Sequence, residues 1–256
     1  MLGALRWILT AASFALLLAS SAAAQTEPES EKETGDTGGW EFELAPLYIW
    51  FAGIEGNASI GPVNAPVSLS FGDVLENLSG VFTLHFEARK SKWSLFTDGM
   101  HLQLEPETTL PNGAPVGVKV ENDIIEVGAA YRVRDAQPSV DLLAGARYTN
   151  LDVKGSSRGV NVVEESWWDG FGGARMRYAF GETKDWSIAA RADAGTGGSD
   201  LTWSAYALVG WQFAKFASVT AGYKWLDYDY TNGTGLSRVD WNVTYQGPIA
   251  GIVFNW

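Results

Sequence analysis

Apolar and polar residues alternate along most of this chain, and the alternation recurs in separate segments. In one of them, Ile125, Val127 and Tyr131 share one parity, whereas Glu126 and Arg132 occupy the other. Successive side chains of a β-strand point to opposite faces, so this segment is predicted to be a strand with one apolar face and one polar face. Strands of this kind form transmembrane barrels, in which the apolar face meets lipid and the polar face meets the interior.

Ten segments carry this pattern. They lie at residues 40–51, 81–90, 93–103, 125–133, 140–148, 168–178, 186–193, 201–213, 217–225 and 241–256. The connections between them alternate between long and short, beginning with a long one, which predicts an up-and-down antiparallel transmembrane β-barrel with both termini in the periplasm. Eight strands are one alternative, and twelve are another if the long connection at residues 53–80 holds a hairpin. Within that connection, residues 73–78 fit one helical turn with Asp73 near its cap.

Two segments carry further information. Trp40 and Trp50 share a parity ten residues apart, which corresponds to about 25 Å along a tilted strand and predicts that they lie in the two aromatic bands of a barrel. In the third segment, Phe96 and Met100 share the parity of Asp98, so its inward face is not determined by the pattern.

The polar parity is predicted to face the lumen and to carry thirteen charged side chains in a network. They are the acids Glu87, Asp98, Glu126, Asp141, Asp169 and Asp193 and the bases Arg89, Arg132, Arg147, Arg175, Arg177, Arg191 and Lys224. An unpaired buried charge is costly, and the two sets nearly cancel, so we expect a charge-paired lumen. A narrow hydrophilic passage lined by the same groups is the alternative. Ten strands lie near the filled end of the range of barrel widths, so any passage is expected to be small or gated.

The composition narrows the function. The chain has no Cys and two His, which excludes disulfides and thiol chemistry and argues against a transition-metal site, so no metal or cofactor is expected. Its net charge of −12 argues against a nucleic-acid partner. Residues 1–24 contain Arg6, an apolar run at 7–18 and a small-residue cleavage site, which predicts a cleaved signal peptide and export. Residues 25–39 are polar and acidic and are predicted to form a disordered periplasmic lead-in before the barrel at 40–256.

Catalysis has little support in the sequence. His85 and Glu87 share a strand face about 6.5–7 Å apart and could form an acid/base pair, which would make a lipid-active enzyme. A histidine in a polar lumen is more often a satisfied hydrogen-bonding residue, and His101 lacks a serine two residues later. We therefore expect a protein that is not an enzyme.

Several phrases resemble small, largely uncharacterised outer-membrane β-barrel proteins of Gram-negative bacteria, a porin-like family. They include HFEARKSKWSLFTDGM at 85–100, LLAGARYTNLDV at 142–153, WWDGFGGARMRY at 167–178, AGYKWLDYDY at 221–230 and GPIAGIVFNW at 247–256. The resemblance implies residence in outer-membrane lipid and a C-terminal assembly signal at Phe254 and Trp256, read by the barrel-assembly machinery. Many members end in Phe, so Trp256 is a departure.

The family implies no catalytic residue and no single function, because the same fold serves anchors, pores, adhesins and enzymes. The first hypothesis is a structural or narrow porin-like barrel of the cell envelope, through which small solutes or ions would pass if it is open. The second is an outer-loop binding or adhesion module built on residues 53–80. The third is the lipid-active enzyme around His85.

Overall fold

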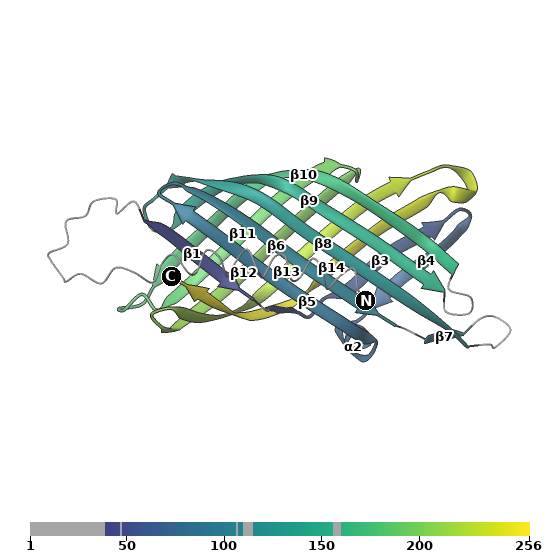
Figure 1. Ribbon diagram of the computed structural model, residues 1–256, viewed down its shortest axis with the longest axis horizontal. Helices are drawn as coiled ribbons and strands as arrows, with labels where there is room; N and C mark the ends of the chain where they lie inside the picture. Colours follow the sequence, from purple (N-terminus) through teal and green to yellow (C-terminus); the bar gives the residue numbers. More distant parts are fainter. Residues whose placement is uncertain (1–38, 47, 106, 110–114, 156–159) are drawn as a thin grey trace. The chain divides into compact units, whose positions relative to one another are not determined.

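The computed structural model describes residues 39–46, 48–105, 107–109, 115–155 and 160–256 (Figure 1). The predicted signal peptide and nearly all of the predicted lead-in lie outside these residues. The elements are β1 (Trp40–Ala45), β2 (Tyr48–Trp50), β3 (Gly53–Ile60), β4 (Val63–Leu69), α2 (Phe71–Glu76), β5 (Leu78–Lys90), β6 (Trp93–Leu104), β7 (Glu107–Thr109), β8 (Pro115–Arg134), β9 (Ser139–Gly155), β10 (Val160–Phe180), β11 (Trp186–Gly197), β12 (Leu201–Ala214), β13 (Ala217–Asn232), η1 (Gly235–Ser237) and β14 (Val239–Asn255).

Ten strands form a closed antiparallel barrel. Their order is β1, β5, β6, β8, β9, β10, β11, β12, β13 and β14, and β14 returns to pair with β1. The strands follow one another around the wall in chain order, so the predicted up-and-down barrel and its count of ten are confirmed. β1 and the end of β14 lie at the barrel end that carries the turns at 91–92, 135–138, 181–185 and 215–216, here called the short-turn end (Figure 1). Whether this end faces the periplasm stays a prediction.

The barrel closes where Phe42 meets Trp256. The Phe42 N–H donates to the Trp256 carbonyl at 2.9 Å, and the Trp256 N–H donates to the Phe42 carbonyl at 3.1 Å. Their rings stack with centroids 5.5 Å apart. The last residue of the chain therefore completes the backbone ladder that lipid requires of a barrel wall.

The long connection before β5 contains the hairpin that the sequence left as an alternative, but the hairpin does not enlarge the barrel. β3 pairs with the far half of β14, and β4 pairs with β3, so the two strands extend the wall at the end opposite the short turns, here called the hairpin end. The helical turn is α2, whose N-cap is Ser70 and whose third residue is Asp73. Hydrogen bonds from Ser70 lower the pKa of Asp73, which completes a capping box.

The first predicted strand, at residues 40–51, is interrupted, and the prediction that Trp50 lies in an outer aromatic band was wrong. The β1–β5 ladder ends at Ala45 paired with His85, because Pro46 has no N–H to continue it. The interruption shifts the parity, so Trp50 faces the interior and is 9% exposed instead of joining an outer aromatic band. Beyond the break, the Thr83 side chain replaces the missing ladder: the Tyr48 N–H donates to its hydroxyl at 2.9 Å, and that hydroxyl donates to the Tyr48 carbonyl.

The exterior of the barrel is apolar between two aromatic bands. Exposed aromatic residues ring the short-turn end: Trp40, Trp93, Tyr131, Tyr178, Trp186, Trp211, Phe213, Phe216 and Trp256. A second set lies further along the strands, where Tyr148 packs against Trp168 at 5.0 Å and Tyr223 against Trp225 at 4.4 Å. Exposed aliphatic side chains such as Leu142 and Val209 fill the space between them. This is the exterior of a transmembrane barrel.

In the residues that the structure describes, no helix is long and apolar enough to cross a membrane.

Candidate functional site

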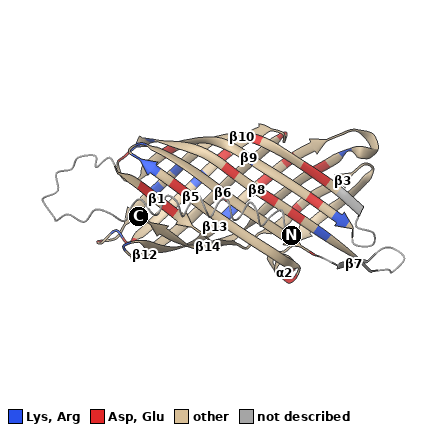
Figure 2. Ribbon diagram, in the orientation of Figure 1, with Lys and Arg blue, Asp and Glu red and all other residues tan. Residues whose placement is uncertain are grey.

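Most buried charged side chains of the described residues form two groups, each joined by ion pairs. Figure 2 shows how Lys, Arg, Asp and Glu are distributed along the strands. The first group, nearer the short-turn end, is here called the Arg175 cluster and consists of Glu43, Glu87, Arg89, Arg132, Asp141, Arg175 and Arg177. The second is called the Arg147 cluster and consists of Glu126, Arg147, Arg191 and Asp193. The members come from β1, β5, β8, β9, β10 and β11, so the contacts tie together strands on different sides of the wall.

In the Arg175 cluster, each buried carboxylate is shared by several guanidinium groups. Arg175 Nη1 lies 2.6 Å from Glu87 Oε2, and Arg175 Nη2 lies 2.9 Å from Asp141 Oδ2. Arg89 Nη2 bridges the same two acids at 3.0 and 2.9 Å, and Arg132 Nε lies 2.8 Å from Asp141 Oδ1. Bidentate and shared contacts of this kind are the strongest ion pairs that side chains form.

The Arg147 cluster spans the interior. From β9, Arg147 reaches Glu126 Oε1 on β8 at 2.9 Å, Asp193 Oδ1 on β11 at 2.8 Å and the Thr202 hydroxyl on β12 at 2.8 Å. Arg191 joins the same two acids at 2.8 Å each. Every carboxylate oxygen of Glu126 and Asp193 thus has a guanidinium partner, which is the condition for burying such groups.

The rings of Phe96 and Phe171 pack against the guanidinium groups of the Arg147 cluster. The Arg191 guanidinium lies 5.2 Å from the ring centroids of both Phe96 and Phe171, and Arg147 lies 5.1 Å from the ring of Phe171. Cation–π contact favours this arrangement. The ring of Phe171 also depends on Gly145, where a Cβ would fall 2.7 Å from the ring. The sequence pattern did not determine which face of β6 points inward. The contact with Arg191 gives the inward apolar residue Phe96 a role there.

Beyond the Arg147 cluster, toward the hairpin end, most inward side chains are apolar, with buried polar residues such as Asn122 and Thr149 among them. The apolar ones are buried and belong to one hydrophobic cluster: Leu102, Leu104, Ile124, Leu151, Leu226, Tyr228, Val243 and Tyr245. Some lie further toward the hairpin end than the ion-paired residue of the same strand, as Leu102 does relative to Asp98 on β6 and Ile124 relative to Glu126 on β8. The barrel therefore carries a charged middle and a mostly apolar half.

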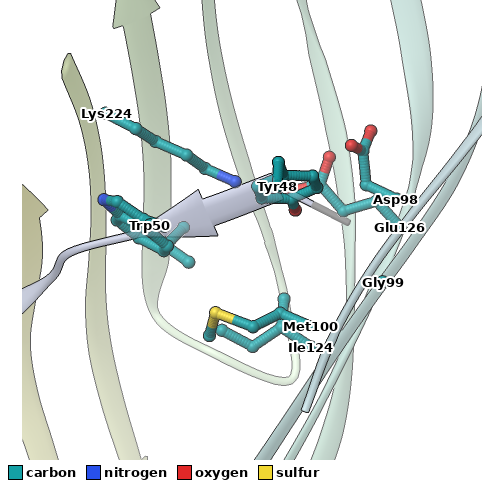
Figure 3. A pocket seen from close by; sticks show the side chains of 9 residues that line it. Tyr48, Trp50, Asp98, Gly99, Met100, Ile124, Glu126 and Lys224 are labelled. Carbon is teal, nitrogen blue, oxygen red and sulfur yellow. The ribbon is translucent and has the colours of Figure 1, made fainter. Parts of the chain in front are cut away.

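Between the charged middle and the short-turn end lies a cavity of about 530 Å³, here called the vestibule. Rim residues such as Gln137, Lys184 and Asn255 mark its mouth, and Lys224 lines its inner end. A second, much smaller cavity of about 10 Å³ lies behind it and shares Tyr48 and Lys224 with it. Figure 3 shows the Lys224 amino group pointing toward Tyr48 in the lining of this smaller cavity.

Two residues of the predicted network stand apart from the ion pairs. Asp169 is buried, but it accepts hydrogen bonds from the Trp167 indole at 3.1 Å and the Ser199 N–H at 2.8 Å. Lys224 lies 4.8 Å from the ring centroid of Trp50, and none of the ion pairs up to 4.0 Å among the described residues includes it. Asp98 contacts His85 at 2.9 Å and lies 3.9 Å from Arg191 Nη1.

Two residues were left out of the predicted network. Glu43 Oε2 lies 3.5 Å from Arg177, and Glu43 Oε1 lies 3.5 Å from His85 Nε2. The signal for Glu43 was present, because its parity is opposite to that of Trp40 and Phe42. The contacts of His85 are with Asp98 and Glu43, whereas Glu87 is taken by arginines.

No protein-family model and no curated protein matches this sequence. Similar solved structures include the outer membrane protease OmpT from Escherichia coli, at 8% identity and a TM-score of 0.47 over 85% of this chain and 96% of that chain. Neisserial surface protein A follows at 12% identity and a TM-score of 0.33 over 84% and 96%. The translocator domain of autotransporter NalP from Neisseria meningitidis has 13% identity and a TM-score of 0.42 over 85% and 89%. The closed ladder and apolar exterior of this chain are themselves those of an outer-membrane β-barrel.

Proposed function

We propose that this protein is a non-enzymatic structural barrel of the outer membrane whose charge-paired interior is closed at rest. The observation that carries the proposal is the position of Arg147. Its side chain is 0% exposed, and its guanidinium bonds to groups on β8, β11 and β12. The charges that would line a passage are used for pairing across the interior.

The apolar half of the interior supports the same function. A path for ions needs polar groups or water along its whole length. Leu104, Leu151 and Leu226 are among the most deeply buried side chains of the described residues, and they occupy the space through which such a path would run. The vestibule would then be a recess with one mouth.

A liposome-swelling assay tests the closed state. The refolded chain is inserted into dextran-loaded liposomes, which are diluted into isosmotic solutions of sugars of increasing size. We expect swelling no faster than in protein-free liposomes. Swelling whose rate falls with sugar size would contradict the closed state and would support the narrow porin-like passage instead.

A second candidate function is binding at the hairpin end, and the lengths of the strands there favour it. β8 has 20 residues and β10 has 21, whereas β6 has 12. About ten residues cross a membrane in a tilted strand, so these hairpins extend well beyond the lipid. Polar outward groups such as His101 and Asp123, 2.6 Å apart, mark this region.

Retention of intact cells on matrix-coated surfaces tests this second function. The comparison is between cells that display the wild-type chain and cells that display a variant with residues 55–68 replaced by a short Gly-Ser linker. If the hairpin end binds, retention falls in the variant while its barrel still resists unfolding in detergent. Equal retention of both cell types, with equal surface amounts, would count against binding through this hairpin.

A role for His85 in ion pairing is proposed in place of catalysis. Both ring nitrogens face carboxylates, with Asp98 at 2.9 Å and Glu43 at 3.5 Å. We expect no lipid hydrolysis by the wild-type protein, and no difference for His85→Ala, when labelled phospholipid or lipopolysaccharide is followed by chromatography. Hydrolysis that His85→Ala abolishes would overturn this assignment.

A further inference from the structure

The vestibule has the size of a ligand site. Its volume of about 530 Å³ lies within the range of about 300–1,000 Å³ that is common for small-molecule pockets. The vestibule would remain if the barrel proved to conduct, so a ligand site in it does not depend on the proposed closed state.

Among the described residues, no carboxylate oxygen lies within 4.0 Å of the Lys224 amino group at the inner end of the vestibule. The lining of the vestibule contains four carboxylates and five cationic side chains, with His85 left aside: Glu41, Glu43, Asp98 and Asp185, against Arg89, Arg132, Arg177, Lys184 and Lys224. The lining therefore carries one positive charge more than it neutralises, and a cation in a protein interior is stabilised by a counter-charge.

Of the described residues, the cationic side chain without an ion pair at the inner end of the vestibule is Lys224. Asp98 is taken by His85, and both oxygens of Glu126 are taken by Arg147 and Arg191. The aromatic face of Trp50, 4.8 Å from the amino group, compensates the lysine only in part. One monovalent anion that reaches this amino group would balance the charges of the lining.

The lining of the vestibule combines charged and apolar side chains. Charged residues such as Glu43, Arg89 and Arg177 come from β1, β5 and β10. Leu208, Ile249 and Val253 contribute uncharged surface from β12 and β14, the two strands that flank β13, on which Lys224 lies. The phenol-bearing residues Tyr48 and Tyr206 lie in the same cavity and can donate hydrogen bonds to an anion.

We propose that the vestibule is a binding site for a small monocarboxylate with an apolar body, which enters from the short-turn end. The carboxylate binds the Lys224 amino group at the inner end of the cavity, and the apolar body lies against Leu208, Ile249 and Val253. A monocarboxylate supplies the single negative charge that the lining lacks, and a charge-assisted hydrogen bond to the lysine gives orientation as well as affinity.

The test is a ¹⁹F NMR titration of 4-fluorobenzoate with the refolded full-length protein in zwitterionic micelles. We expect saturable broadening and a shift of the fluorine signal. Lys224→Met removes the charge at nearly constant volume and should weaken binding about tenfold or more, the usual loss for a charge-assisted contact. Lys184→Met, at the mouth of the same cavity, is the matched control and should change affinity less than about twofold.

Two further measurements separate the site from partition into micelles and from misfolding. 4-Fluorobenzamide has the same shape without the charge and should bind at least about tenfold more weakly than 4-fluorobenzoate. Lys224→Arg keeps the charge and should restore most of the affinity lost in Lys224→Met. Absence of saturable binding, equal affinity of Lys224→Met and wild type, or equal binding of the amide would each overturn the proposal.

Discussion

Arg147 and Asp193 join two non-adjacent strands through the interior of the barrel. Arg147 Nη2 on β9 lies 2.8 Å from Asp193 Oδ1 on β11, and both side chains are 0% exposed. β10 lies between these strands in the wall, so the contact does not follow the backbone ladder. It adds a connection across the lumen, and the Arg147 cluster is built around it.

Removal of Arg147 should destabilise the barrel strongly. In Arg147→Met, Glu126 and Asp193 each lose a guanidinium partner while they stay buried, and a broken buried pair costs about 3–5 kcal/mol. Urea unfolding of the refolded protein in detergent measures the change. The control is Arg238→Ala, which removes an exposed pair with Asp240 and should leave the midpoint almost unchanged. Equal midpoints for the two variants would contradict the structural role of Arg147.

Gly145 should not tolerate a methyl group. A Cβ at this position would lie 2.3 Å from the Val127 carbonyl oxygen and 2.7 Å from the Phe171 ring, so Gly145→Ala must displace backbone or the ring beneath Arg147. Overpacking of this kind costs about 1–3 kcal/mol. The same unfolding assay checks it, with Gly99→Ala as the control, because nothing lies within 4 Å of a Cβ at Gly99. A destabilisation of equal size at both glycines would show that close packing is not the cause.

The C-terminal residue should contribute through its backbone as well as its ring. Deletion of Trp256 removes both hydrogen bonds with Phe42, at about 0.5–1.5 kcal/mol each, whereas Trp256→Phe keeps them and a ring that can stack. We expect slower refolding into vesicles and lower stability for the deletion, with Trp256→Phe close to wild type. In cells, the deletion should also lower the amount of assembled barrel if the assembly machinery reads this end. A deletion as stable as wild type would exclude a role in closure.

The orientation of the barrel in the membrane can be tested with single introduced thiols, because the chain has no Cys. Lys92→Cys places a thiol in a short turn, and Leu236→Cys places one on η1 at the hairpin end, where Leu236 is 84% exposed. A membrane-impermeant maleimide added to intact cells should label Leu236→Cys and leave Lys92→Cys unlabelled until the outer membrane is opened. Labelling of Lys92→Cys in intact cells would place the short turns, and with them both termini of the barrel, on the outside.

The two-residue period of apolar and polar positions was sufficient to predict the barrel, its ten strands and the outward face of most of those strands. It failed at Trp50, because Pro46 interrupts the β1–β5 ladder and the break shifts the parity. Parity also could not say which inward residues would be apolar. Phe96 is inward because it packs beneath Arg191, a contact between residues 95 positions apart.

The charged interior was only partly accessible from the sequence. Parity places Asp169 and Asp193 on inward faces alike, and Asp169 is even the cross-strand neighbour of Arg147 in the β9–β10 ladder, but parity does not give the side-chain contacts that each makes. Asp193 meets Arg147, whereas Asp169 lies where Trp167 and Ser199 can bind it. Which cation lacks a partner depends on register between non-neighbouring strands, and so the position of Lys224 required the structure.

Single-channel conductance of the refolded chain in a planar bilayer is the sharpest test of the proposed closed state of the interior. Resistance of the reconstituted protein to heat unfolding in gels would establish that the barrel is folded. We predict a silent bilayer, because in the proposed closed state the Arg147 cluster and the apolar half would block a path for ions. Discrete, reproducible conductance steps from folded protein would contradict it and would mean that the inward charges line a passage.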